Sequence, residues 1–196
     1  MAPTRDPIHG ALLLAAGAST RLGRAKQLIE IDGEPLLRRA ARALLDTSPH
    51  TLIVVLGHDA AVLRTCVGDL PLQCIVAPDH AEGLAASLRA GIAALSADCD
   101  GALVALTDQP ALDAGHLLAL CGAWRASPAR AIASAYAGVL GVPALLPRGW
   151  FADVMRLRGD TGARALLRER SAQVIAIDAP ALARDLDTPD DLEQPS

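Results

Sequence analysis

Short, almost wholly apolar runs alternate with longer amphipathic segments along the first two thirds of the chain. The apolar runs cover residues 11–16, 51–56, 72–76 and 101–106. Runs of this length, bounded by Gly, Pro, Asp or His, are typical of strands that are buried on both faces, as in a parallel sheet. Segments with helical spacing of apolar positions lie between and after them, at 35–45, 60–67, 83–95 and 114–126. This alternation predicts an α/β fold.

The last third of the chain is less regular. Residues 131–135 and 142–146 are expected to pair as two strands around an Ala137-Gly138 turn, either inserted into the sheet or attached to its edge. Helices are expected at 150–157 and 161–169, a strand at 174–177, and a final helix with Thr188 as N-cap and Pro189 at its first position. The predicted fold is an open, mostly parallel sheet with helices on both faces, in one domain spanning 1–196.

Composition limits the classes of ligand and the compartment. Aromatic residues make up only 2% of the 196 positions and the net charge is −4, which argues against a nucleic-acid surface. No signal peptide precedes the first apolar run and no run has transmembrane length, so we expect no membrane contact and a cytoplasmic protein. The four cysteines lack zinc-ligand spacing and are expected to be buried small apolar residues.

The single lysine, Lys26, follows the first apolar run in a chain that otherwise uses arginine. A compact, flexible ammonium suits contact with a phosphate. The alternative interpretation is that Lys26 is an ordinary surface lysine. Gly17 and Gly23 stand six residues apart, which does not fit the GxGxxG dinucleotide fingerprint, and the spacing from Gly23 to Lys26 excludes a Walker A loop. The amides of the loop from Gly17 to Lys26, the hydroxyls of Ser19 and Thr20, and three cations can wrap a triphosphate.

This loop resembles the signature LAAGxSxRxGxxKxL of the sugar-phosphate and molybdopterin nucleotidyltransferases. The match runs from Leu14 to Leu28, with these positions in register: Ala15, Ala16, Gly17, Ser19, Arg21, Gly23 and Lys26. Residues 32–37, 81–91, 107–110, 141–143, 159–164 and 185–189 resemble later blocks of the MobA/MocA-like molybdenum cofactor nucleotidyltransferase family. Two departures are Ala77-Pro78, where Asn-Pro is frequent, and a short segment after Leu192.

The resemblance implies a Rossmann-like nucleotidyltransferase fold and Mg²⁺-dependent transfer of a nucleotidyl group to the phosphate of molybdenum cofactor. Alanine at the position of Ala16 accompanies cytidylyl transfer in the family, so CTP is the implied donor. The alternatives are guanylyl transfer from GTP to molybdopterin, a sugar- or alcohol-phosphate acceptor, and a carrier that delivers molybdenum cofactor to a molybdenum hydroxylase apoenzyme. The implied catalytic residues are Lys26, Arg21 and Asp108; the implied nucleotide contacts are Ala15, Ala16, Gly17, Ser19, Gly23, Gly83 and Ser87.

Metal ligands are expected among the aspartates at strand ends. Asp108 lies two residues after the end of the 101–106 run, and oxygen ligands suit Mg²⁺. Asp187 is the family position for a second ligand, with Asp185 two residues away. A turn-forming role for Asp108 and a helix-capping role for the 185–191 cluster are the competing interpretations.

Two further pairs are ambiguous from sequence alone. His58 and His80 fall in loops on the predicted ligand side, where a histidine is more often a surface or capping residue than a catalytic one. Asp160 and Arg164 either hold the second substrate or form an ion pair four residues apart at the start of a helix.

Overall fold

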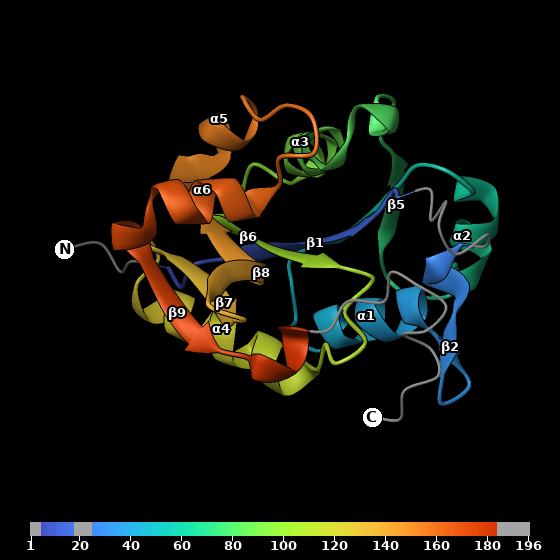
Figure 1. The fold of residues 1–196 in the computed structure, drawn as a ribbon, viewed down its shortest axis with the longest axis horizontal. Helices are drawn as coiled ribbons and strands as arrows, with labels where there is room; N and C mark the ends of the chain where they lie inside the picture. Colours follow the sequence, from blue (N-terminus) through green and yellow to red (C-terminus); the bar gives the residue numbers. More distant parts are fainter. Residues whose placement is uncertain (1–4, 18–24, 184–196) are drawn as a thin grey trace.

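The computed structural model describes residues 5–17 and 25–183, which build on a seven-stranded sheet in the order β5-β4-β1-β6-β8-β7-β9 (Figure 1). Of its six neighbouring pairs, four are parallel, and β8 runs antiparallel to both β6 and β7. The predicted open, mostly parallel sheet is therefore confirmed. The strands are β1 His9–Ala15, β4 Leu52–Leu56, β5 Gln73–Val76, β6 Gly101–Leu106, β7 Ala131–Tyr136, β8 Val139–Pro147 and β9 Val174–Asp178.

Helices cover both faces of the sheet, with α3, α5 and α6 above it and α1 and α4 below it in Figure 1. Side chains alternate along β1: Leu13 packs in the core cluster with α1, α2 and α4, whereas Leu12 and Leu14 pack in the cluster with α3, α5 and α6. Burial on both faces explains why this strand reads as a continuous apolar run. The helices are α1 Leu36–Leu45, α2 Ala60–Val67, α3 Leu84–Ala94, α4 Ala114–Ala126, α5 Phe151–Val154 and α6 Ala163–Glu169.

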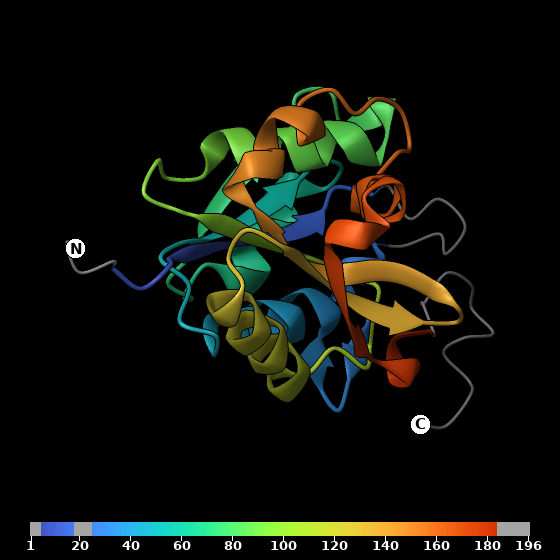
Figure 2. The ribbon, with the colours of Figure 1, turned by 90° about the vertical axis from the view of Figure 1, so that its left-hand side faces the viewer.

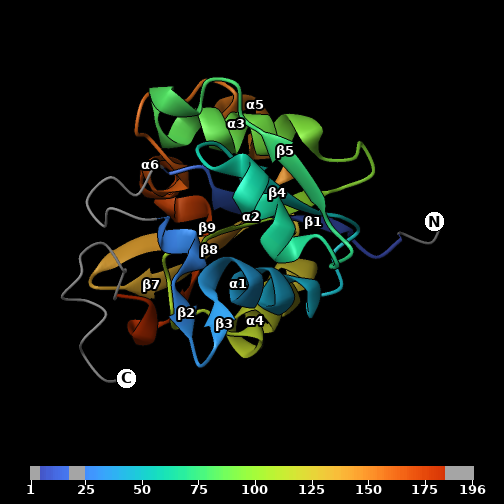
Figure 3. The ribbon, with the colours of Figure 1, turned by 90° about the vertical axis from the view of Figure 1, so that its right-hand side faces the viewer.

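The strand order changes direction at β1. The chain passes from β1 to β4 and β5 on one side, and then returns to place β6 on the other side of β1. Register pairs Ala15 with Leu56 and Leu14 with Leu106, so the loops after β1, β4 and β6 leave the same edge. Views from the two ends of the sheet show this layering (Figures 2 and 3). Open α/β sheets bind ligands in the crevice at such a switch point.

Some predicted elements differ from the structure. The helix expected at 150–157 is instead a 3-10 turn, Arg148–Trp150, followed by the four-residue α5. The Ala137-Gly138 hairpin is part of the sheet, since β8 pairs with β6. A small hairpin, β2 Glu30–Ile31 with β3 Glu34–Pro35, was not predicted; the turn residues Asp32 and Gly33 both have positive φ, as its tight turn requires. The expected helix at Thr188 and Pro189 lies outside the described residues.

The cysteines follow the expectation only in part. Cys99 and Cys121 are buried, but Cys66 and Cys74 are partly exposed. All four are free thiols, and burial raises the pKa of each. Within residues 5–17 and 25–183, no helix is both long enough and apolar enough to cross a bilayer.

Candidate active site

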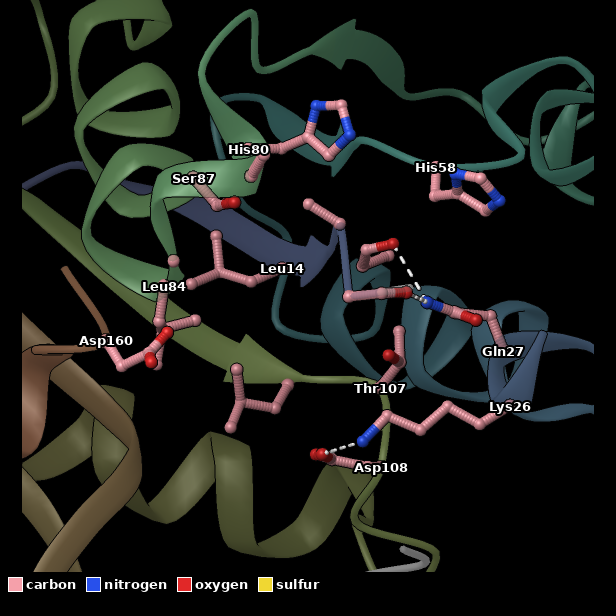
Figure 4. A pocket seen from close by; sticks show the side chains of 16 residues that line it. Leu14, Lys26, Gln27, His58, His80, Leu84, Ser87, Thr107, Asp108 and Asp160 are labelled. Carbon is pink, nitrogen blue, oxygen red and sulfur yellow. Dashed lines mark hydrogen bonds and ion pairs between the residues drawn. The ribbon is translucent and has the colours of Figure 1, made fainter. Parts of the chain in front are cut away.

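A cavity of about 580 Å³ opens at the carboxyl edge of the sheet, where the loops after β1, β4, β5 and β6 converge (Figure 4). Polar side chains reach it from segments that are far apart in the sequence. Its lining includes Ala15, Ala16, Gly17, Lys26, Gln27, His58, His80, Gly83, Ser87, Thr107, Asp108 and Asp160. The switch point between β1 and β6 thus carries Lys26 and Asp108, two of the charged residues that the sequence singled out.

Lys26 and Asp108 form an ion pair across this switch point. The Lys26 Nζ donates to Asp108 Oδ2 at 2.6 Å, and the two side chains are only 16% and 18% exposed. Lys26 belongs to the 3-10 helix η1 (Lys26–Leu28) after the first loop, and Asp108 follows β6. Two residues 82 positions apart are therefore brought into direct contact. A partly buried pair of this kind is stronger than one in open water because solvent screens it less.

The second carboxylate oxygen of Asp108 supports a cation at this place. Asp108 Oδ1 is buried and has no hydrogen-bond partner within the described part of the chain. A buried anionic oxygen without a donor is costly, and a divalent ion with oxygen preference satisfies it. The described residues contain no cluster of three or more His, Cys, Asp or Glu side chains that could hold a metal by themselves. Phosphate oxygens or residues outside that range would have to complete the coordination.

The first loop is anchored by a residue that sequence reasoning missed. Gln27 is 1% exposed, and its Nε2 donates to the carbonyls of Ala15 at 3.0 Å and Gly17 at 2.9 Å (Figure 4). One amide thus ties the start of the loop to η1, directly beside Lys26. The available signal was a polar residue between Lys26 and the apolar pair Leu28-Ile29, in the segment that follows the loop.

The predicted nucleotide-contact residues that the structure describes all line the cavity. Ala15, Ala16 and Gly17 come from the end of β1, and Gly83 and the buried Ser87 come from the start of α3. Gly83 has φ +111, and a Cβ there would lie 2.6 Å from the carbonyl carbon of Gly159. This position therefore requires glycine so that the loop before α6 can approach α3.

Four predicted site residues, together with Asp185, are not placed by the structure. Ser19, Arg21 and Gly23 belong to the first loop and Asp187 to the C-terminal segment, and all lie outside the described residues. Their assigned roles stay predictions.

Asp160 and Arg164 line a second, smaller cavity of about 260 Å³ beside the first. The two cavities share Leu14, Leu84, Leu106 and Asp160. Both Asp160 and Arg164 are exposed, and no ion pair joins them in the described structure. The expected helical ion pair is therefore not formed, and a role for Asp160 and Arg164 in holding the second substrate stays a prediction. His58 and His80 both line the larger cavity.

A family model described as the MobA-like NTP transferase domain matches residues 11–175. The chain belongs to this family. MobA-like NTP transferases transfer nucleotidyl groups, so the chain is a nucleotidyltransferase, and its cavity at the β1/β6 switch point is the candidate site for the nucleoside triphosphate. The predicted family and class of enzyme are both confirmed.

Several known proteins are similar to this MobA-like chain over nearly its whole length. Nicotine blue oxidoreductase of Paenarthrobacter nicotinovorans is 34% identical, with 96% of each chain covered. The purine catabolism protein PucB of Bacillus subtilis strain 168 is 30% identical, again with 96% of each covered. The crystal structure of Rv0371c from Mycobacterium tuberculosis H37Rv superposes with a TM-score of 0.84 at 28% identity, covering 96% of this chain and 97% of that one. A complex of Rv0371c with manganese has also been solved; it covers the same shares, with a TM-score of 0.78 at 26% identity.

Proposed function

We propose that this nucleotidyltransferase moves a cytidylyl group from CTP to the phosphate of molybdenum cofactor in a Mg²⁺-dependent reaction that releases pyrophosphate. The observation that carries the proposal is the partly buried Lys26–Asp108 pair at the switch point, with Asp108 Oδ1 unpartnered among the described residues. A cation and an available carboxylate oxygen at this edge fit a metal-bound triphosphate.

The chemistry follows from the charges at the site. An oxygen of the acceptor phosphate attacks the α-phosphorus of CTP; one P–O bond forms, and the bond to the bridging oxygen breaks with its electron pair leaving on pyrophosphate. Lys26 Nζ stabilises the added negative charge as a compact point charge, and Arg21 is proposed to assist it. A phosphate nucleophile is already ionised at neutral pH, so this step needs no general base.

Asp108 would hold the metal, with Asp187 as the proposed second ligand. When bound, Mg²⁺ supplies neutralisation of the charge on the α-phosphate and on the leaving pyrophosphate. The manganese complex of Rv0371c supports a divalent ion in a related protein, and Mg²⁺ is our proposal for this chain.

The choice of CTP rests on Ala16. Its side chain is 7% exposed at the end of β1 and lines the cavity, so its methyl group takes up space next to the backbone. A pyrimidine needs less room there than a purine. Ala16→Gly should therefore lower the ratio of CTP to GTP efficiency by roughly tenfold or more without inverting it. A constant ratio would place base selection elsewhere and favour guanylyl transfer as an equal candidate.

The names of two relatives bear on the acceptor. PucB is named for purine catabolism and the Paenarthrobacter protein for nicotine blue, so both names concern nitrogen heterocycles. Hydroxylation of such rings is chemistry of molybdenum hydroxylases, which supports molybdenum cofactor as the acceptor and a hydroxylase apoenzyme as the protein partner.

The deciding experiment is a turnover panel of four NTPs with Mg²⁺ and purified molybdenum cofactor, scored by pyrophosphate release and by the dinucleotide product. We expect CTP to give the highest kcat/KM. Binding of the cofactor by calorimetry without turnover of any NTP would instead establish the carrier.

A further inference from the structure

His80 lies in the NTP cavity at a distance from the charged pair. It begins the 3-10 helix η2 (His80–Glu82), between β5 and α3, and its ring lines the same cavity as Lys26 and Asp108. Figure 4 shows the imidazole on the far side of the cavity from the Lys26–Asp108 pair, beyond the end of β1. If the triphosphate meets that pair, the other end of the nucleotide extends toward this side.

The imidazole is held in place by the core. Its Nδ1 lies 3.0 Å from the carbonyl oxygen of Ala77, and Ala77 is fully buried, with its own N–H bonded to Leu56 O at 2.9 Å. The other side of the ring rests against Gly57: a Cβ there would lie 2.8 Å from His80 Cγ and Cδ2 and 2.7 Å from Ala16 O. Only glycine leaves room for the ring at this position, so the imidazole forms a fixed part of the cavity wall.

This anchoring sets the hydrogen-bonding character of the ring. A carbonyl oxygen only accepts, so the proton of the His80 ring must be on Nδ1. In a neutral imidazole Nε2 is then an acceptor. Nε2 has no hydrogen-bond partner in the described part of the chain. It is not one of the buried polar atoms that lack a partner, so it is accessible to solvent. The wall of the cavity thus presents one lone pair that a ligand can use.

We propose that His80 reads the amino edge of the nucleobase and so separates CTP from UTP. Cytosine carries an exocyclic amine that donates to Nε2, whereas uracil carries a carbonyl oxygen at the same position, which would face the lone pair of Nε2. The two pyrimidines have nearly equal size, so the methyl group of Ala16 cannot distinguish them. This inference rests on the proposed nucleotide site. It adds selection by hydrogen bonding at His80 to the selection by size at Ala16.

The test compares Kd values for CTP and UTP, each with Mg²⁺ and without acceptor, by calorimetry, in wild type and in His80→Phe. Phenylalanine retains a flat ring but offers no lone pair. We expect wild type to bind CTP more tightly than UTP. In His80→Phe the ratio of the two Kd values should change by roughly tenfold toward equality, the effect of one hydrogen bond to a base. His80→Gln, whose amide can turn either oxygen or nitrogen to the base, should also relax the ratio and covers the case in which His80→Phe does not fold.

His50→Phe is the matched control, since His50 is an exposed histidine that is not among the residues lining the cavity. The CTP to UTP ratio should be unchanged in it. An equal affinity of wild type for CTP and UTP, or an unchanged ratio in both His80 variants, overturns the proposal. If the CTP to UTP ratio depends on His80 but the protein transfers nothing to molybdenum cofactor, recognition of the base by His80 is supported and the proposed acceptor is wrong. Failure of this inference and failure of the proposed function are therefore distinguishable.

Discussion

At the scale of residues, the carboxylate of Asp108 sets the charge at the site. Asp108 has one oxygen on Lys26 and one without a partner among the described residues, in a side chain that is 18% exposed. One oxygen of this carboxylate neutralises the positive charge of Lys26 in the free enzyme, and the other oxygen is left for a metal. Both properties depend on its negative charge, and its position at a strand end keeps it out of the apolar core.

Asp108→Asn should therefore abolish most Mg²⁺-dependent transfer without unfolding the protein. The substitution preserves shape but removes the charge, and we expect kcat to fall more than tenfold, a barrier increase above about 1.4 kcal/mol. Steady-state turnover and a thermal melt measure the two effects. Asp98→Asn is the control, because Asp98 is an exposed aspartate before β6, at the opposite edge of the sheet. Retention of more than about a tenth of the wild-type turnover would rule out Asp108 as a required ligand.

Lys26→Arg tests whether an ammonium is needed. The 2.6 Å contact is made by a side chain that is only 16% exposed, so little space is left for a planar guanidinium. We expect turnover to fall tenfold or more because the triphosphate is displaced from its reactive position. Arg168→Lys, an exposed change on α6, should have no such effect. Equal kcat/KM values for Lys26→Arg and wild type would return Lys26 to the role of an ordinary surface residue.

At the scale of elements, the Gln27 side chain joins η1 to the end of β1. Gln27→Met keeps the volume but leaves the carbonyls of Ala15 and Gly17 without their donor. Burial of these unsatisfied carbonyls should lower the free energy of unfolding by about 1–3 kcal/mol. The KM for the NTP should rise as well, because Lys26 is adjacent to Gln27 and would lose its fixed position. Denaturant titration and kinetics measure both. Gln173→Met, at an exposed position in η4 (Ser171–Gln173), is the control; similar losses in the two variants would contradict the proposed anchor.

Elements were predictable from sequence where burial imposes a long, regular pattern. The bounds of α2, α4 and β6 agree with the expected 60–67, 114–126 and 101–106 because a polar residue or glycine ends each mainly apolar segment on both sides. The β2–β3 hairpin was missed because two-residue strands carry no period, and α5 is shorter than expected because apolar spacing at 150–157 also fits a turn packed on the core.

Within the site, strand ends were predictable and side-chain partners were not. A residue after an apolar run must lie at the carboxyl edge, which located Lys26 and Asp108. The positions of Gln27 and His80 depend on which carbonyls are nearby, and those are set by tertiary contacts. The roles of Ser19, Arg21 and Asp187, and the extent of one domain over 1–196, stay predictions.

At the scale of the whole molecule, the two edges of the sheet differ. The carboxyl edge carries the cavity, whereas at the amino edge His9, the first residue of β1, is sealed against α4 and the end of α1 with 3% exposure. The Thr47 hydroxyl donates to Leu44 O, so its oxygen accepts from His9 Nε2 at 3.1 Å. Burial, with a smaller contribution from the charge of Arg125, lowers the pKa of His9 from 6.5 to about 4.

The lowered pKa of His9 predicts a global loss of stability in mild acid. Between pH 6.5 and about 4 the unfolded chain binds a proton at His9 and the folded protein does not. The contribution of His9 is therefore complete above pH 6.5, falls as the pH is lowered through that window, and levels off below it, by up to about 3 kcal/mol in all.

Replacing His9 removes this titration. His9→Asn should show a smaller fall in the free energy of unfolding across the window, even though it is less stable than wild type at neutral pH because packing is lost. The measurement is urea unfolding at several pH values, with His50→Gln, an exposed histidine, as the control. His116 acts in the same direction, since burial also lowers its pKa, so some acid sensitivity should remain in the variant. An acid dependence identical in His9→Asn and wild type would mean that the folded protein protonates His9 as readily as the unfolded chain, and that the amino edge is open to water.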